Sequence, residues 1–408
     1  MDQELIEATL RFTEAITREW DVIVIGSGPA GAIAALECAG SGLAALLLDR
    51  KNFPRPKVCG GCLNEVALDQ LAHAGLAGLP MELGAQPIHS FRLGTRGAEA
   101  SMALPGGVAL TRHRLDAGLV RAAIKAGVQF LPHTSATDAG SERHHRLVSL
   151  RNEGQRGMAR ARLVIAADGL AGGFTRGLSR IVSTTAPDAY IGLGACLRED
   201  SGYSPGVIHM ATHRQGYVGL VRVEDGLLNV AAALDPQWLH SVGSPAEAMS
   251  QVLAGVGWPI PGKLKAGRLQ GTPSLSTFRT PVAAERVLLI GDAAGYLEPF
   301  TGEGMAWALL GGRMAAALAI SALSANEMDT LTARWDETYN AVLGNRRRIC
   351  SLLTRWLRRP YWVNIGVRVL AVAPILSRPI IKILNATGAT NVSYNQMFAS
   401  HRSGFPKG

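Results

Sequence analysis

A glycine pattern near the N-terminus places the strongest constraint on the fold. The short apolar run over 21–25, DVIVI, leads directly into Gly26, Gly28 and Gly31, which have the spacing G-x-G-x-x-G. An alanine-rich helix over 29–40 and a second strand over 44–48 follow, so the stretch predicts a β-α-β unit. In such a unit the glycines permit a tight turn, backbone approach to a pyrophosphate and close helix–strand packing, while the helix N-terminus faces the phosphates. We predict a dinucleotide site here; a turn that serves packing only is the alternative.

Asp49 supplies the acidic residue that such a unit uses for ribose. It closes the second predicted strand 18 residues after Gly31, where a carboxylate can accept hydrogen bonds from ribose hydroxyls. An acidic residue at this position argues against a 2′-phosphate on the nucleotide.

The nucleotide-binding region is discontinuous in the sequence. Residues 107–131 read as strand, helix and strand, and a buried strand over 161–169 ends in Asp168 and Gly169. Residues 287–318 return to a strand, a glycine-rich loop and a long helix from about 303. The alternation between 183 and 278 is typical of an antiparallel sheet. We therefore predict an α/β fold in which a sheet-rich domain is inserted into a Rossmann-like domain.

The predicted boundaries follow from these changes in pattern. The nucleotide-binding domain comprises 1–80, with an amphipathic helix within 1–19, and then 106–182 and 279–340; the inserted domain comprises 81–105 and 183–278; a basic amphipathic helical tail occupies 341–408.

Composition narrows the function classes. The 408 residues carry a net charge of +9, which favours anionic partners, but aromatic residues are only 6% and no nucleic-acid-binding motif occurs. We expect no nucleic-acid partner. The five scattered cysteines predict no disulfide framework, and we expect no metal site. The N-terminus lacks the apolar core of a signal peptide, and the apolar run over 361–376 is interrupted by polar residues. We expect a cytoplasmic protein and leave open peripheral membrane contact through the basic tail.

A second predicted cofactor-binding loop indicates FAD rather than NAD. Gly291 and Asp292 end a predicted strand, where the carboxylate can hold polyol hydroxyls, and Pro299 to Gly304 form another glycine turn at a helix start. The N–H groups of that turn suit the electron-rich edge of a reduced isoalloxazine ring. A plain NAD dehydrogenase does not need this second loop.

Together these motifs resemble one family. The ordered set IGSGPAGAIAA, LLLDR, FPRPKVCGG, RHRLD, VIAADG and GDAAGYLEPFTGEGM is similar to the flavoproteins grouped with para-hydroxybenzoate hydroxylase. It is most similar to the geranylgeranyl reductases, whose P-x-x-K-x-C-G-G loop matches 54–61. The resemblance implies a glutathione-reductase-type FAD domain, an antiparallel-sheet substrate domain that covers the flavin, and NAD(P)H as a transient reductant.

The resemblance also implies roles for individual residues. It places the pyrophosphate on the loop of Gly26, Gly28, Pro29, Ala30 and Gly31, and the adenosine part at Asp49 and Arg50. Arg112 is expected near the phosphates or the ribityl chain, and Asp168 and Gly169 are expected to support the loop after the first strand. Gly291 and Asp292 are expected to hold the ribityl chain, and Pro299, Gly302 and Gly304 to lie at the flavin ring. Glu303 is expected to cap the helix that follows or to relay protons.

The loop around Cys59 and Cys62 admits four interpretations. A zinc site lacks further ligand pairs, and a disulfide redox pair would need a second nicotinamide-binding module. The third has Gly60 and Gly61 letting the backbone pass close to the flavin, with Cys59 facing the ring or substrate and Cys62 packing as a small hydrophobe. In the fourth both thiols only pack. The resemblance favours the third, with Lys57 neutralising a phosphate or the reduced flavin.

Two reactions and one non-enzymatic role remain open. The enzyme would reduce a carbon–carbon double bond in a hydrophobic isoprenoid- or polyketide-like substrate, or hydroxylate such a substrate through a C4a-hydroperoxide. Tyr217, in the segment GYVGLVRVEDG, is with Cys59 one of two candidate catalytic residues. The segment keeps this tyrosine but lacks the Trp and Phe-Pro of the reductases' Tyr-x-Trp-x-Phe-Pro motif. The Trp-x-Trp-x-Ile-Pro motif of flavin-dependent halogenases is also missing. The third possibility is a membrane- or carrier-binding protein with structural FAD. Substrate identity and oligomeric state stay open.

Overall fold

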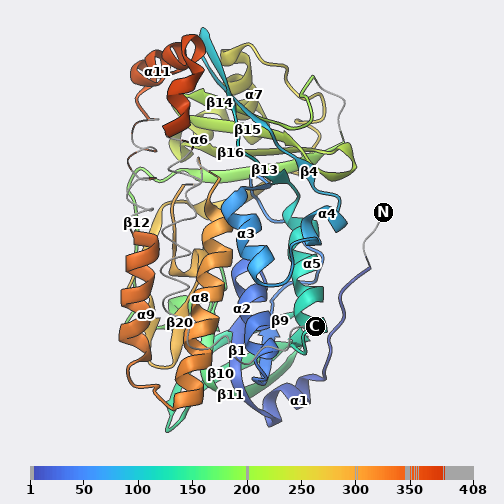
Figure 1. Ribbon diagram of the computed structural model, residues 1–408, viewed down its shortest axis with the longest axis vertical. Coiled ribbons are helices and arrows are strands. Elements are labelled where there is room, and N and C mark those ends of the chain that lie inside the picture. Colours follow the sequence, from blue (N-terminus) through green and yellow to red (C-terminus); the bar gives the residue numbers. More distant parts are fainter. Residues whose placement is uncertain are drawn as a thin grey trace.

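The chain forms two stacked regions joined by several crossings of the backbone (Figure 1). The structure is a computed structural model that describes residues 4–198, 202–298, 300, 302–344, 350, 352, 354, 356, 358–379 and 381. One region is built on a mainly parallel sheet, and the other on a largely antiparallel sheet. The predicted α/β architecture with an inserted antiparallel sheet is therefore confirmed.

An eight-stranded sheet forms the first region. The strands β20, β11, β1, β2 and β8 lie side by side and run parallel, with β19 at one edge and the β9–β10 hairpin extending β11. Strands β1 and β2 are almost entirely buried, which explains their continuous apolar runs. The strand bounds are β1 Glu19–Ile25, β2 Ala45–Leu48, β8 Gln129–Leu131, β9 Thr134–Glu142, β10 His145–Asn152, β11 Gln155–Ala166, β19 Ala283–Ala284 and β20 Val287–Leu289.

Helices cover this sheet and bring distant parts of the sequence together. In Figure 1, α2 lies between α5 and α8, and α3 packs beside α8. The helix bounds are α2 Pro29–Gly40, α3 Glu65–His73, α4 Leu79–Glu82, α5 Arg112–Lys125, α8 Gly304–Ala325 and α9 Leu331–Tyr339. Among the described residues, α8 alone is long and apolar enough to cross a membrane, but 72% of its apolar window is buried inside the fold. It serves here as the core helix against α2.

A seven-stranded sheet forms the second region. Its order is β17-β13-β16-β15-β14-β5-β6, antiparallel except for the parallel pair β14 and β5. Separate apolar clusters join the sheet to α7 and to α11. The bounds are β5 Ser90–Thr95, β6 Ala98–Ala103, β13 Ile191–Leu197, β14 Val207–His213, β15 Gly216–Arg222, β16 Leu228–Leu234, β17 Gln270–Ser274, α6 Pro236–Val242, α7 Pro245–Val256 and α11 Pro360–Val372.

Two small sheets and several single turns complete the connections between the regions. The order β3-β7-β4 unites Cys62–Leu63, Val108–Ala109 and Gln86–Pro87, and the order β12-β18-β21 unites Val182–Thr185, Thr277–Thr280 and Gly295–Tyr296. The turns are η1 Thr175–Gly177, η2 Glu224–Gly226, η3 Gly291–Ala294, η4 Asn340–Gly344 and η5 Pro374–Ser377.

The N-terminal helix is much shorter than predicted. Helix α1 spans only Phe12–Thr17, and the backbone N–H of Arg11 before it donates to Glu14 Oε2 at 2.8 Å. Upstream, the backbone N–H of Ile6 donates to the carbonyl of Phe53, and that of Thr9 donates to the carbonyl of Phe130. These bonds to the domain replace helical ones, so the prediction was wrong over 4–11.

The predicted basic tail is described only in part. Helix α11 packs on β5 and β6, with Val363 and Val367 buried. The cations Arg346–Arg348, Arg355 and Lys382 lie outside the described residues.

Gly312 of α8 provides a stability prediction. A Cβ at Gly312 would lie 2.3 Å from the carbonyl oxygen of Ala30 in α2, whereas a Cβ at the adjacent Gly311 would meet nothing closer than 4.0 Å. We expect Gly312→Ala to lower the free energy of unfolding by about 2 kcal/mol, because overpacking outweighs the gain in helix propensity. The matched control Gly311→Ala should be neutral or stabilising. Urea unfolding measures both; equal effects would contradict the close approach.

Candidate functional site

In the glycine loop between β1 and α2, neighbouring backbone segments approach too closely to leave room for side chains. A Cβ at Gly26, whose φ is +100°, would lie 2.3 Å from the carbonyl oxygen of Ala167, and one at Gly31 would lie 1.9 Å from the carbonyl oxygen of Gly26. Gly28 caps α2 without a side-chain hydrogen bond, and Pro29 takes the first helical position. Gly28, Pro29, Ala30 and Gly31 line a cavity, so the N-terminus of α2 faces an open space.

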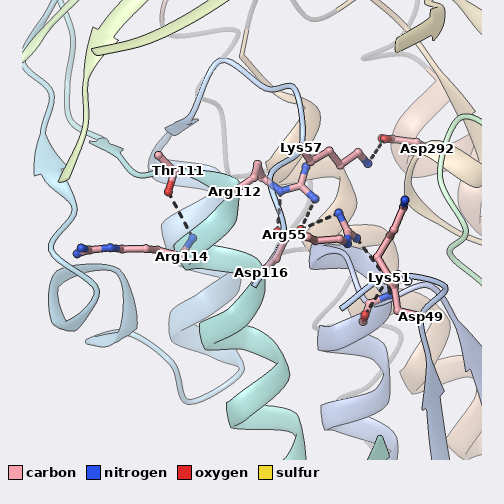
Figure 2. Close-up of polar contacts among 10 residues, drawn as sticks. Asp49, Lys51, Arg55, Lys57, Thr111, Arg112, Arg114, Asp116 and Asp292 are labelled. Carbon is pink, nitrogen blue, oxygen red and sulfur yellow. Dashed lines mark hydrogen bonds and ion pairs between the residues drawn. The ribbon is translucent and has the colours of Figure 1, made fainter. Parts of the chain in front are cut away.

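Asp49 lies at the end of β2 and organises the neighbouring loops. Its Oδ2 accepts hydrogen bonds from Ser27 N at 3.0 Å and Ser27 Oγ at 2.8 Å, and its Oδ1 accepts one from Lys51 N at 2.9 Å. Arg55 Nη2 reaches the same Oδ2 at 3.3 Å (Figure 2). The adjacent Arg50 is exposed. Asp49 thus ties the glycine loop to the segment after β2.

A buried chain of charges continues from Arg55 to the start of α2. Asp116, fully buried on α5, accepts hydrogen bonds from Arg112 Nε at 2.6 Å and Arg112 Nη2 at 2.8 Å, and Arg55 Nη1 lies 3.7 Å from it (Figure 2). Burial opposes the charge of Arg112, but Asp116 more than compensates and raises the pKa of Arg112. Arg112 Nη2 lies 3.3 Å from where a Cβ of Gly28 would be. A permanent cation therefore stands at the N-terminus of α2.

Lys57 and Asp292 connect two loops that are distant in the sequence. Lys57 Nζ donates to Asp292 Oδ2 at 3.0 Å, as Figure 2 shows, and both residues line the cavity. Asp292 follows Gly291, whose φ is +56°. Arg279 Nη1 donates to the carbonyls of Asp292 and Ala293, at 3.0 Å each, which holds the loop in place.

Asp168 supports a loop and does not face the cavity. Its carboxylate accepts hydrogen bonds from Phe174 N at 2.7 Å and from Thr175 Oγ1 at 2.7 Å. Gly169 lines the cavity, and a Cβ there would lie 3.7 Å from Lys57 Nζ.

The second glycine turn meets the cavity from the other side. Gly302 and Gly304 line it, whereas Pro299 lies outside the described residues. Glu303 occupies the N-cap position of α8, where the sequence placed it, but its side chain makes no capping hydrogen bond. Its carboxylate is buried instead beside Cys350 Sγ, at 2.9 Å.

The cysteine loop lies between the two sheets. Cys59, Gly60, Gly61 and Cys62 all line the cavity, and Asn229 Nδ2 of β16 donates to the carbonyl of Cys59 at 2.9 Å. Both cysteines are free thiols. Burial, with a smaller effect of Cys59, raises the pKa of Cys62 to about 12, so Cys62 is protonated at neutral pH.

Beyond the cysteine loop the cavity becomes apolar. Its volume is about 340 Å³, and it runs from the glycine loop to one face of the second sheet. Its apolar lining includes Ile88, Phe91, Leu93, Met102, Leu104, Ile208, Met210, Leu220 and Val221. A polar end with cations and an apolar end thus share one space.

Tyr217 lies next to the apolar end but is not among the residues that line it. Its ring packs edge-to-face on Phe300, with centroids 5.2 Å apart. Burial, and the nearby carboxylate of Glu298, raise the pKa of Tyr217, and its hydroxyl makes no hydrogen bond of normal geometry to the described residues. Tyr217 therefore stays protonated.

Several residues of the site escaped sequence reasoning. Arg55 and Asp116 join the cation chain, Arg279 fixes the Asp292 loop, and Tyr296 lines the cavity. Tyr296 stands within a motif already quoted, so its position could have been found. The pairing of Asp116 with Arg112 is an i,i+4 contact within α5 that the sequence RHRLD could have indicated, whereas the approach of Arg55 depends on how its loop packs.

The comparisons with known proteins show a family and a shared fold. The profile of the FAD binding domain family matches residues 19–310. Digeranylgeranylglycerophospholipid reductase 1 of Methanopyrus kandleri is 30% identical over 364 residues, which cover 82% of this chain and 91% of the relative. Menaquinone reductase of Mycobacterium tuberculosis is 28% identical over 414 residues, which cover 86% of this chain and 90% of the relative. The p-nitrophenol 4-monooxygenase of Pseudomonas putida shares the fold, with a TM-score of 0.75 at 17% identity over 91% of this chain and 100% of that one.

The residues present fit FAD. The open N-terminus of α2 and the Arg112 cation suit its pyrophosphate. Asp49 is buried behind the glycine loop and does not line the cavity, so its contact with the ribose stays a prediction. Lys57 and Asp292 suit the phosphate and ribityl part, and the apolar widening beyond Cys59 suits the ring.

Lys57 provides a test of this arrangement. We expect Lys57→Met to weaken FAD binding about tenfold, or about 1.4 kcal/mol, because it removes a cation from the phosphate end and leaves Asp292 without that counter-ion. FAD titration of the apoprotein by flavin fluorescence measures the loss.

The matched control is Lys51→Met. Lys51 is exposed, and its contact with Asp49 comes from the backbone, so affinity should hold. An equal loss in both variants would point to net charge rather than to the Lys57–Asp292 contact.

Proposed function

The chain belongs to the FAD binding domain family, and we propose that it is a flavin-dependent reductase that saturates carbon–carbon double bonds in a prenyl chain. The predicted resemblance to geranylgeranyl-reductase-like flavoproteins is confirmed, and the chain is an FAD-dependent oxidoreductase. The names of two relatives, reductases of a digeranylgeranyl lipid and of menaquinone, support a prenylated substrate.

The apolar end of the cavity is the observation that carries this proposal. A prenyl chain has no polar group along its length, so it requires a long apolar lining continuous with the flavin site. The lining on β5, β6, β14 and β15 meets that requirement, and Cys59 stands where the two ends of the cavity join.

The reaction needs one hydride and one proton for each double bond. Reduced FAD supplies the hydride when bound. We assign the proton to Cys59 Sγ, which lines the cavity and passes the proton to the second carbon; solvent then restores the thiol. Tyr296 lines the same cavity and keeps its proton, because burial raises its pKa. NAD(P)H is the proposed electron donor, and the apolar walls exclude water.

Gly219 bears on the choice between reactions. It occupies the position of the tryptophan in the Tyr-x-Trp-x-Phe-Pro motif, and it lines the cavity. A Cβ there would approach the flexible end of Met210 at 3.3 Å and lie in ordinary contact with the carbonyl oxygen of Ala231 at 3.7 Å, so the glycine leaves space that a larger side chain would occupy. A wider cavity also admits an aromatic or polyketide substrate, which keeps hydroxylation as the second candidate.

Anaerobic turnover decides between these functions. Holoenzyme reduced with NADPH under nitrogen and given a geranylgeranyl lipid in detergent should yield a product with two more hydrogens per double bond, by mass spectrometry. Gly219→Trp should retain that turnover and FAD binding, because the reductases carry tryptophan at this position. Oxygen uptake coupled to a hydroxylated product, with no anaerobic turnover, would establish the monooxygenase instead. Flavin that NAD(P)H cannot reduce, with no product, would indicate structural FAD.

The two cysteines should differ in turnover. We expect Cys59→Ser to slow reduction about a hundredfold, as loss of a general acid does, and Cys62→Ser to stay within about twofold. At pH 8 a thiol of pKa about 12 is thiolate in roughly one molecule in ten thousand, so Cys62 should also resist iodoacetamide. Equal and complete loss of turnover in both variants would restore the redox-pair interpretation.

A further inference from the structure

The C-terminal helical segment carries an unusual concentration of exposed apolar side chains. Nine of the fifteen large apolar side chains that are exposed in the described part of the chain fall within 352–376. They are Leu352, Trp356, Tyr361, Trp362, Ile365, Val369, Val372, Ile375 and Leu376. Scattered single residues of this kind need no explanation, but a contiguous group indicates a binding surface.

Helix α11 presents these side chains on one face. Tyr361, Ile365, Val369 and Val372 recur at intervals of three and four residues, which aligns them along the helix. Trp362 borders the row and is 52% exposed, and Val372 is 88% exposed. The opposite face packs on the second sheet. We call the exposed row, together with Trp362, Ile375 and Leu376, the α11 face.

Positive charge surrounds the α11 face. Arg359, Arg368 and Arg378 are exposed in the same segment, and Arg96 lies beside it, since its carbonyl accepts a hydrogen bond from Asn364. Residues 338–408 contain 11 Lys and Arg and no Asp or Glu, whereas residues 1–337 contain 30 and 32, respectively. The excess positive charge of the whole protein therefore resides in this C-terminal part.

The same segment borders the apolar cavity. Trp356, Leu370, Ser377 and Ile381 line the cavity, while their neighbours on α11 and η5 face solvent. Figure 1 places α11 at the outer end of the second region, away from α1 and the far edge of the main sheet. One face of the segment thus meets solvent while the other borders the substrate space.

We propose that the α11 face docks on an anionic lipid surface. Tyrosine and tryptophan with aliphatic neighbours suit the boundary between headgroups and acyl chains, and arginines suit anionic headgroups. A second copy of this chain fits less well, because the cationic borders of two such faces would repel each other. A docked α11 places the cavity border at the membrane, where lipid substrates reside. Docking does not depend on the proposed reaction.

Vesicle co-sedimentation of the full-length holoenzyme tests the proposal. We expect binding to phosphatidylcholine vesicles that contain phosphatidylglycerol, weakened by salt, and little binding to pure phosphatidylcholine. Trp362→Ser with Val372→Ser should lower partitioning at least tenfold, and each of Arg359→Gln and Arg368→Gln about fivefold. The control Met81→Ser removes an exposed apolar side chain on α4 and should change nothing.

Other results would overturn the proposal. Equal binding by wild type and the α11-face variants, or no binding, would remove this surface as the docking site. A wild-type dimer that the variants abolish, without vesicle binding, would assign the face to a second copy. Turnover of detergent-dispersed substrate separates the two proposals: docking-defective variants should retain it, and a wild type that binds vesicles but lacks turnover would contradict only the reaction.

Discussion

Direct contact between backbone segments around the glycine loop is the constraint on which the rest of the structure depends. A Cβ at Gly26, Gly31 or Gly312 would lie only 1.9 to 2.3 Å from a carbonyl oxygen, so the backbones can approach this closely at these three points only because the residue is glycine. This contact fixes the N-terminus of α2 against the cavity and brings the loop of Asp292 and the start of α8 to the same space. Residues separated by more than two hundred positions thereby form one site.

Charge then gives the two ends of the cavity different roles. Arg112 is a permanent cation that Asp116 pairs with in the interior, and Arg55 extends this pairing to Asp49. These charged side chains are therefore concentrated at the end of the cavity where the phosphates of FAD are expected. Past the cysteine loop the walls come from β5, β6, β14 and β15 and are apolar. A cofactor with a charged end and a flat ring can span this change, and a prenyl chain can continue beyond it.

Local sequence patterns predicted much of this arrangement, and packing supplied the rest. The β-α-β unit, the loop at Asp292 and the helix after it were predictable, because glycine and strand-end signals depend on adjacent residues. The N-terminal helix was not, since Ile6 and Thr9 bond to the domain instead of to their own segment. The contact of Glu303 with Cys350 was not predictable either, because Cys350 lies 47 positions further along the chain. The α11 face emerged only when burial separated the inward Val363 and Val367 from their exposed neighbours.

The central claim is that one cavity holds FAD at its charged end and a prenyl chain at its apolar end. Photo-crosslinking of the holoenzyme with a geranylgeranyl lipid that carries a diazirine at the chain terminus tests this most directly. The account predicts that labelled peptides come from β5, β6, β14 and β15, including Phe91 and Met210, and that unlabelled geranylgeranyl lipid suppresses the labelling. Labelling confined to other surfaces, or unaffected by that competitor, would contradict it.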